Sequence, residues 1–441
     1  MANDRRELWI MFGIIAATVA YSRLLRAPCD DAYIFYVYAN NWLAGNGPTF
    51  NGARVEGFTS PLWLLLLTAA GFVKIPLPVA GEVLGTFSGL LALLATHRLA
   101  RAAGLAGVWA LLPVGLLAAS GDFVFYMASG LALPLFTAFV AWSTAAVLEA
   151  PPAHTLRSPR FAALVAGMIL TRPEGALVAA LLYGYGWVAT RSPRLVLAAG
   201  VRTLALLLPV LALKAWYYGY PLPNTYYAKS GAGFANVAHG LRYLGAAVPR
   251  HLPLLLLLLP AALDRSRTRA ASPARPLPFL FASTAVWLAS IALQGGDNMV
   301  GARVVVPALP WLCVGLVALA GAAKPAATFV AVGIASAGMV LGYARTESVR
   351  IHAEGWRADA VVREAAGRYL GKHFPPDTLV ALNPAGSIPF YSELPTIDML
   401  GLNDEHIAHR GARNRKQRFG HQAGDGAYVL SRRPDVILLG S

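Results

Sequence analysis

The stretch VVVPALPWLCVGLVALAGA-AKP-AATFVAVGIASAGMVLGY, residues 304–343, decides the fold class of this chain. It contains two apolar runs, 304–322 and 326–343, and Lys324 is the one charged residue between them. A helix needs about 20 mostly apolar residues to cross a lipid bilayer. The stretch therefore predicts two successive transmembrane helices.

The composition of the whole chain agrees with a membrane protein. Of the 441 residues, 56% are hydrophobic and 13% are charged, whereas soluble proteins carry roughly 25% charged residues. The net charge of +15 fits the Lys and Arg of cytoplasmic loops. A nucleic-acid partner is not expected, because no basic stripe with interleaved aromatics occurs. Cys29 and Cys313 have neither metal-site nor disulfide spacing.

Further apolar runs predict an α-helical polytopic protein. They lie at 8–22, 60–73, 80–97, 104–120, 123–148, 161–171, 175–190, 195–217, 251–264 and 277–293. No small-residue cleavage site follows the first run, so we expect it to remain as a helix. The run 60–73 starts at Ser60-Pro61 and ends at Lys74, which favours a helix lying on the membrane surface. About 11 spanning helices are thus predicted.

The basic loops set the predicted orientation. They are His97–Arg101, 157–160, 191–194, 265–269 and Lys324, and Lys and Arg mark the cytoplasmic side. This places the amino terminus inside, and the first loop (23–79) and the tail (344–441) outside. Arg23 and Arg26 disagree for the first helix alone. We expect a transmembrane domain over 1–343 and a periplasmic domain over 344–441.

The tail predicts a small α/β domain. Residues 379–382, 396–399 and 435–439 read as strands, Ala385-Gly386-Ser387 opens a turn or short helix, and 426–432 read as a helix. Gly and Pro separate these pieces, as is usual for turns.

Two adjacent carboxylates, Asp30 and Asp31, follow the first helix on the predicted outer face. Neighbouring like charges favour a proton on one of them, which suits a general base acting on an acceptor hydroxyl. A carboxylate also stabilises an oxocarbenium-like transition state. Alternatively, one of them caps the helix predicted at 32–42. We expect one to cap and the other to act, with Asp30 as the first choice for the base.

Other polar residues share the predicted outer face. Arg172 and Glu174 interrupt an apolar stretch, where ionisable residues are costly and usually paired or functional. We expect either a mutual salt bridge or contact between Arg172 and a phosphate. Lys229 and Arg303 are further candidates for the same phosphate, since cationic side chains suit that ligand. Further candidates for sugar or acceptor contact are Tyr33, Glu56, Glu174, Asn224, Asp297 and Asn298. For Tyr33, with Tyr36 and Tyr38, a role as an interfacial anchor is the alternative; for Glu56 it is a helix start.

Several strings together resemble the GT-C superfamily of glycosyltransferases. They are DDAYI (30–34), GNG (45–47), RVEGFTSPLW (54–63), TRPEG (171–175), PNTYYAK (223–229), GGDNM (295–299) with Arg303, IDMLGLND (397–404) and GDGAYVL (424–430). Within the superfamily they look most similar to AftB-like arabinofuranosyltransferases and the related pilin arabinosyltransferase TfpW.

The resemblance implies a GT-C fold and a polyprenyl-phosphate sugar donor used on the periplasmic face of the bacterial inner membrane. It places the catalytic aspartate at Asp30 or Asp31, and adds Asp398, Asn403 and Asp404 as sugar or acceptor contacts. The implied sugar is D-arabinofuranose, from decaprenyl- or undecaprenyl-phosphoryl arabinose. An arabinan, another glycan or a pilin remains open as acceptor, because this chain is shorter than typical AftB-like members.

The departing phosphate needs cations, and a divalent metal is possible but not required. The main rival is a lipid-linked sugar transporter or flippase. Transporters tend to have repeats and a site near the midplane, whereas no repeat is visible here and the polar residues gather at one edge. A GT-C transferase for another sugar, such as mannose, is the second alternative.

Overall fold

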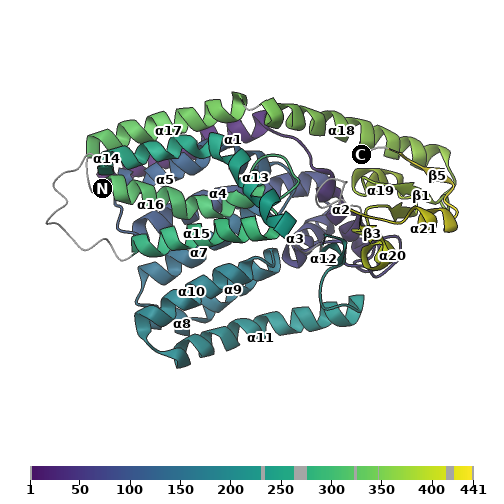
Figure 1. Cartoon of the computed structure of the whole chain (residues 1–441), viewed down its shortest axis with the longest axis horizontal. Helices are drawn as coiled ribbons and strands as arrows, with labels where there is room; N and C mark the ends of the chain where they lie inside the picture. The colour runs from purple at the N-terminus through teal and green to yellow at the C-terminus, as the bar shows by residue number, and fades with distance from the viewer. Residues whose placement is uncertain are drawn as a thin grey trace.

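The computed structural model describes residues 2–229, 234–262, 276–321, 325–345, 347–413 and 422–439. Long apolar helices form a bundle, and a small α/β unit covers one end of it (Figure 1). The bundle contains α1 (Ala2–Leu24), α2 (Asp30–Leu43), α3 (Pro61–Phe72), α4 (Leu77–Ala102), α5 (Val108–Ala119), α6 (Gly121–Met127), α7 (Leu133–Glu149), α8 (Pro152–Arg157), α9 (Pro159–Thr171), α10 (Gly175–Thr190), α11 (Pro193–Tyr218), α12 (Asn224–Lys229), α13 (Phe234–His251), η1 (Leu252–Leu257), α14 (Leu258–Ala262), α15 (Pro276–Gln294), η3 (Arg303–Ala308), α16 (Leu309–Gly321) and α17 (Pro325–Arg345).

Within these described residues, seven helical stretches are long and apolar enough to cross a membrane. They are Arg5–Leu24, Leu77–Ala102, Pro193–Tyr218, Asn236–Pro260, Pro276–Gln294, Arg303–Gly321 and Pro325–Arg345. The bent pair α5–α6 makes an eighth if it is one span. The predicted number of about 11 requires the shorter helices α7, α9 and α10 to cross as well, with α3 left at the surface.

The prediction of one continuous run over 123–148 is wrong in detail. Residues 121–127 form α6, which bends by 73° away from α5, and α7 begins only at Leu133. The bend between α5 and α6 falls between the predicted runs 104–120 and 123–148, where the Ser120 hydroxyl accepts the Phe123 N–H at 3.4 Å and caps the new helix. Gly130, at φ +81°, then turns the chain between α6 and α7.

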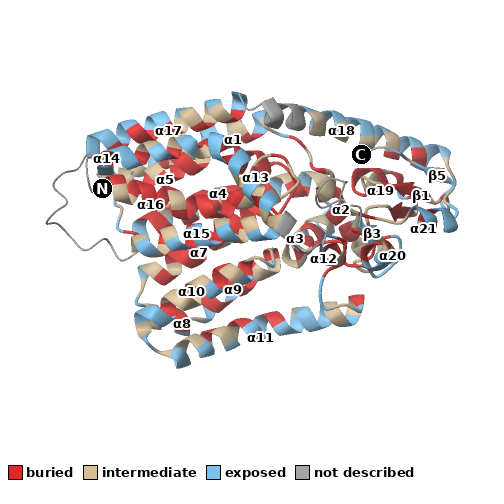
Figure 2. Ribbon diagram, in the orientation of Figure 1, coloured by how far each residue is buried: buried red, intermediate tan, exposed pale blue. Residues whose placement is uncertain are grey.

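Lipid-facing surfaces are visible in the distribution of burial. Buried residues concentrate along α4, α7 and α16, while α11 carries mainly intermediate and exposed ones (Figure 2). The exposed residues of α11 include Leu197, Leu204, Leu213 and Trp216. Such a large apolar face is unsuited to water, and it fits the hydrocarbon of a bilayer. The protein is therefore a multi-pass membrane protein.

The α/β unit follows α18 (Glu347–His373). Its parallel sheet has the order β2-β1-β5, formed by Thr396–Asp398, Val380–Leu382 and Val436–Ile437. All three strands were predicted, as were the helix α21 (Gly426–Ser431) and the short helix α19 (Ser387–Ser392). Helix α20 (Glu405–Arg410) and the hairpin of β3 (Ala412–Arg413) and β4 (Ala423–Gly424) complete the unit.

The elements at the two ends of the bundle come from different parts of the chain. The amino terminus and α8 lie at one end, while α2, α12 and the α/β unit lie at the other (Figure 1). At the first end Glu7 pairs with His97 at 2.7 Å, and Arg98 pairs with Glu149 at 2.6 Å. The basic loops 265–269 and Lys324, which also entered the orientation argument, lie outside the described residues.

Candidate active site

A cleft of about 700 Å³ lies where the bundle meets the α/β unit, and we call it the reaction cleft. Its walls come from the start of α2, the end of α12, the loop after α15, one face of α18, and the segments 383–387 and 399–402. Of the predicted site residues it brings together Asp30, Asp31, Tyr33, Lys229 and Asn298. They come from three segments far apart in the chain.

Asp30 is occupied by contacts with the α/β unit. Its Oδ1 accepts the Ser387 N–H at 2.9 Å and the Ser387 hydroxyl at 2.5 Å, and its Oδ2 accepts the Gly386 N–H at 3.1 Å. Arg363 lies 3.6 Å from Oδ1. The prediction that Asp30 or Asp31 caps its own helix is wrong, because the N-cap of α2 is Cys29, without a side-chain cap bond. The Asp30 carboxylate instead binds the backbone at the start of α19.

Asp31 differs from its neighbour. Its half-buried side chain lines the reaction cleft, and it makes no hydrogen bond or ion pair with another described residue. Its charge still acts on Arg303. Within the described part of the chain, Asp31 is thus a carboxylate in the cleft whose lone pairs are available to a ligand.

Arg303 lies behind the cleft wall rather than on it. It holds Asp297 in a bidentate ion pair, with Nε–Oδ2 at 2.7 Å and Nη2–Oδ1 at 3.0 Å. Burial pushes the pKa of Asp297 upward, but the charge and hydrogen bonds of Arg303, helped by Lys229 and Arg172, hold that pKa below its ordinary value. The three cations predicted to meet one phosphate therefore all lower the pKa of the same carboxylate, Asp297. Of the three, only Lys229 lines the reaction cleft.

Arg172 lies beside a separate small cavity with Trp287 and Gln294. Its Nη2 donates to Glu174 Oε1 at 2.6 Å. Burial raises the pKa of Glu174, yet the charge and hydrogen bond of Arg172 outweigh it and the pKa is lowered overall. The structure thus forms the mutual salt bridge expected as one alternative, and phosphate contact by Arg172 stays a prediction.

Tyr33 and Glu56 have surroundings other than those expected. Tyr33 is 7% exposed and packs its ring on Phe390 and Tyr391 of the α/β unit, so the anchor interpretation is wrong. Glu56 lies five positions before Pro61, the first residue of α3, and instead pairs with Lys214 of α11 at 2.6 Å. Burial raises the pKa of Glu56 to about 6, against the opposing effect of Lys214.

The remaining predicted contacts build a structural element that we call the bridge, made of residues 219–229 and 397–404. Asn224 Nδ2 donates to the carbonyls of Gly401, Leu402 and Asp404 at 2.9, 3.1 and 3.2 Å. Asp398 Oδ2 accepts from the backbone and side chain of Asn403 at 2.8 and 3.0 Å. The Asn224 bonds hold the two segments together at the edge of the reaction cleft, and the Asp398–Asn403 bonds brace the segment 397–404 internally.

Sequence reasoning missed the contribution of α18. Trp356, Asp359, Ala360 and Arg363 line the reaction cleft, and Asp359 also pairs with Arg363 at 3.1 Å. Their spacing of i, i+3, i+4 and i+7 marks one face of a helix, which is the signal that would have found them. Among the described residues, no group of three or more His, Cys, Asp or Glu side chains is arranged to hold a metal ion.

Comparison with known proteins identifies a matching family model and a curated relative. Residues 350–441 match a family described as a domain of unknown function, DUF8728. The terminal β-(1→2)-arabinofuranosyltransferase of Mycobacterium tuberculosis is 31% identical over 347 residues, covering 69% of this chain and 54% of that protein. This chain thus spans about half the length of that relative.

Two solved structures share the fold. ArnT from Cupriavidus metallidurans bound to undecaprenyl phosphate superposes with a TM-score of 0.64 at 13% identity, covering 88% of this chain and 85% of ArnT. The apo state gives a TM-score of 0.61 at 14% identity over the same shares. The chain therefore has the polytopic GT-C fold with a small α/β domain, as predicted. The resemblance to GT-C arabinofuranosyltransferases is confirmed as well.

Proposed function

We propose that this protein transfers D-arabinofuranose from a polyprenyl-phosphoryl donor to a glycan acceptor. One observation carries the proposal: Asp31, a carboxylate without a hydrogen-bond partner among the described residues, shares the reaction cleft with Lys229. The similarity to an arabinofuranosyltransferase supports the sugar. The likeness to an ArnT structure that binds undecaprenyl phosphate supports the lipid carrier.

In the proposed reaction, Asp31 removes the proton of an acceptor hydroxyl. The freed oxygen attacks C1 of the arabinofuranose, a C1–O bond to the acceptor forms, and the C1–O bond to the donor phosphate breaks. The polyprenyl phosphate leaves with the electron pair of that bond. The geometry favours Asp31 over Asp30 as the base, because Ser387 and Gly386 already occupy the Asp30 oxygens.

The cations of the site suit the leaving group. Lys229 is exposed at the end of α12 and borders the reaction cleft. Cationic groups placed where negative charge develops lower the barrier most in a site that excludes water. Arg303 contributes through its field rather than by contact, because Asp297 occupies two of its donors.

The direct test is transfer by purified protein in detergent. The donor is synthetic decaprenyl-phosphoryl arabinose, and the acceptor is an arabinofuranose oligosaccharide whose extension is followed by mass spectrometry. We expect arabinose transfer and release of decaprenyl phosphate. If a mannose-phosphoryl lipid is consumed while the arabinose donor is not, the sugar assignment is wrong. If neither lipid is consumed, the enzymatic proposal is wrong.

We further propose that the protein lies in the bacterial inner membrane with its reaction cleft on the periplasmic side. The support is the positive-inside pattern and the position of α8, which carries Arg157, at the end remote from the α/β unit (Figure 1). Both native cysteines are buried, so single cysteines can be introduced as labels. An impermeant maleimide should modify Ser431→Cys in spheroplasts but not His154→Cys, and the reverse pattern would overturn this orientation.

A further inference from the structure

A second cleft of about 490 Å³ lies on the other side of the bridge. Ile397, Asn403 and Asp404 line it, whereas Met399, Leu400 and Leu402 of the same segment line the reaction cleft. The other half of the bridge divides in the same way, with Tyr220 in the second cleft and Lys229 in the reaction cleft. The two clefts are therefore neighbours that share the bridge as a common wall.

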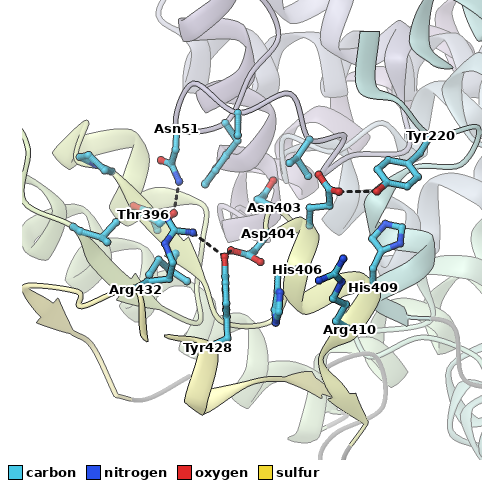
Figure 3. A pocket seen from close by; sticks show the side chains of 17 residues that line it. Asn51, Tyr220, Thr396, Asn403, Asp404, His406, His409, Arg410, Tyr428 and Arg432 are labelled. Atoms are coloured by element: carbon cyan, nitrogen blue, oxygen red, sulfur yellow. Dashed lines mark hydrogen bonds between the residues drawn. The ribbon is translucent and has the colours of Figure 1, made fainter. Parts of the chain in front are cut away.

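Aromatic rings with fixed orientation line the second cleft (Figure 3). The rings of Tyr220 and His409 lie 4.5 Å apart, and those of His406 and Tyr428 are stacked at 3.9 Å. Tyr220 donates its hydroxyl proton to Glu405 at 2.6 Å, which fixes the tilt of the ring. Aromatic side chains combine an apolar face with a polar tip, so they suit ligands whose faces are C–H rich and whose edges carry hydroxyls.

The charged groups of the second cleft balance one another. Two carboxylates, Asp404 and Glu405, face two guanidinium groups, Arg410 and Arg432. Arg410 is exposed and makes no hydrogen bond or ion pair with another described residue. An anionic ligand would call for a surplus of cations, whereas a neutral polyhydroxyl ligand uses donors and acceptors alike. The balance therefore favours a neutral ligand.

A third cleft extends this polar surface. It has a volume of about 400 Å³, is lined by Asn40, Asn41 and Glu393, and shares Asn51 and Pro395 with the second cleft. Sites for small organic ligands measure roughly 300–1,000 Å³. Two such hollows in succession suit a ligand built of repeated small units better than a single small molecule.

From these features we infer that the second cleft binds the acceptor, a neutral oligosaccharide, several units away from the hydroxyl that reacts. The inference rests on the proposed function and gives it a substrate class. The acceptor end enters the reaction cleft beside Asp31, and the preceding units cross the bridge toward Tyr220, His409 and Arg410. A folded protein acceptor such as a pilin fits less well, because the polar groups lie inside concave hollows rather than on a flat face.

The chain offers a matched control for testing this inference. His409 stacks on Tyr220 at 4.5 Å and 34°, and the exposed His373 stacks on Tyr369 of α18 at 4.5 Å and 37°. The second pair borders neither the second cleft nor the reaction cleft. His409 also contacts the Tyr227 ring at 4.2 Å, so His409→Ala removes two ring contacts at the second cleft, whereas His373→Ala removes a contact of the same geometry away from it.

The experiment compares a disaccharide with a longer oligosaccharide of arabinofuranose as acceptors for full-length protein in detergent. Loss of one ring contact or hydrogen bond to the ligand is worth about three- to tenfold in affinity. We expect His409→Ala and Arg410→Ala to raise KM for the longer acceptor by about that factor, and to raise KM for the disaccharide less. Little change in kcat is expected, and His373→Ala should behave as wild type.

Direct binding separates this inference from the proposed function. Calorimetric titration of the longer oligosaccharide requires no donor, so it reports on the second cleft even if no sugar is transferred. Weaker binding by His409→Ala than by His373→Ala supports the inference. Equal binding by both variants and wild type overturns it, as does binding of a pilin-derived peptide in place of the oligosaccharide. Failure of the proposed function would appear instead as absence of donor turnover in wild-type protein.

Discussion

Asp30 and Ser387 are 357 positions apart in the chain, yet one carboxylate oxygen of Asp30 accepts both the N–H and the hydroxyl of Ser387. This contact ties the start of α2 to the α/β unit. It also separates the roles of two adjacent aspartates, since Asp31 keeps its lone pairs for the reaction cleft. Under the proposed function, a structural carboxylate and the catalytic base therefore lie side by side.

The first prediction follows from this division. Asp31→Asn should leave the melting temperature near that of wild type but slow sugar transfer by about a hundredfold to ten-thousandfold, the usual contribution of a general base. Asp30→Asn should do the reverse, with a lower melting temperature and much of the activity retained. Transfer assays and thermal melting in detergent on the same preparations check both. Near wild-type transfer by Asp31→Asn would move the base elsewhere, to Asp30 or Asp359.

Much of this architecture is predictable from the sequence because its signals are local. An apolar run of sufficient length predicts a transmembrane helix. The strands that begin at Val380 and Thr396 are predicted by short runs of strand-forming residues between turns. The break between α6 and α7 was missed, because the single turn at Gly130 lies inside an apolar run and is a weaker signal than the apolarity around it.

The sequence predicts one structural and one catalytic aspartate, but which of Asp30 and Asp31 takes each proposed role was not predictable in the same way. It depends on which carboxylate meets the N–H of Ser387, and that contact forms only when the α/β unit folds onto the bundle. The same holds for Glu56, whose partner Lys214 comes from α11. The α18 face around Arg363, in contrast, has a plain helical spacing that a systematic search for periodicity would find.

The second prediction concerns Arg303 and Asp297, whose side chains are only 14% and 8% exposed. Removing one partner of a buried pair costs about 3–5 kcal/mol, because the other charge is left uncompensated. Arg303→Ala should therefore lower stability strongly, and adding Asp297→Asn should restore part of the loss.

The matched control for that pair is Arg98→Ala, which breaks the more exposed pair with Glu149. Exposed pairs contribute about 0–1 kcal/mol, so its melting temperature should stay close to wild type. Equal losses for Arg303→Ala and Arg98→Ala would show that the Arg303 pair is not isolated from water.

The third prediction concerns the bridge. Asn224→Ala removes the donor that serves the carbonyls of Gly401, Leu402 and Asp404, and an unsatisfied buried polar group costs about 1–3 kcal/mol. Amide hydrogen exchange should speed up in residues 397–404. Asn40→Ala, at an exposed position of α2, should leave that exchange unchanged. Unchanged exchange in Asn224→Ala would mean that the sheet alone holds the bridge.

The last prediction concerns Asp398, which is 1% exposed at the end of β2. Burial raises its pKa from 3.8 to about 6, although hydrogen bonds from Asn403 and Leu400 act in the opposite direction. Between these values the unfolded chain has lost the proton and the native protein still holds it. The contribution of Asp398 to native stability is therefore fully present below pH 3.8 and is lost as the pH rises to about 6.

The shift of about two pKa units corresponds to about 3 kcal/mol of stability. Asp398→Asn resembles the protonated acid at every pH, so the melting temperature of wild type minus that of Asp398→Asn should fall as the pH rises from 3.8 to about 6 and then level off. A difference that stays constant over this range would show that the hydrogen bonds from Asn403 and Leu400 outweigh burial and keep Asp398 ionised.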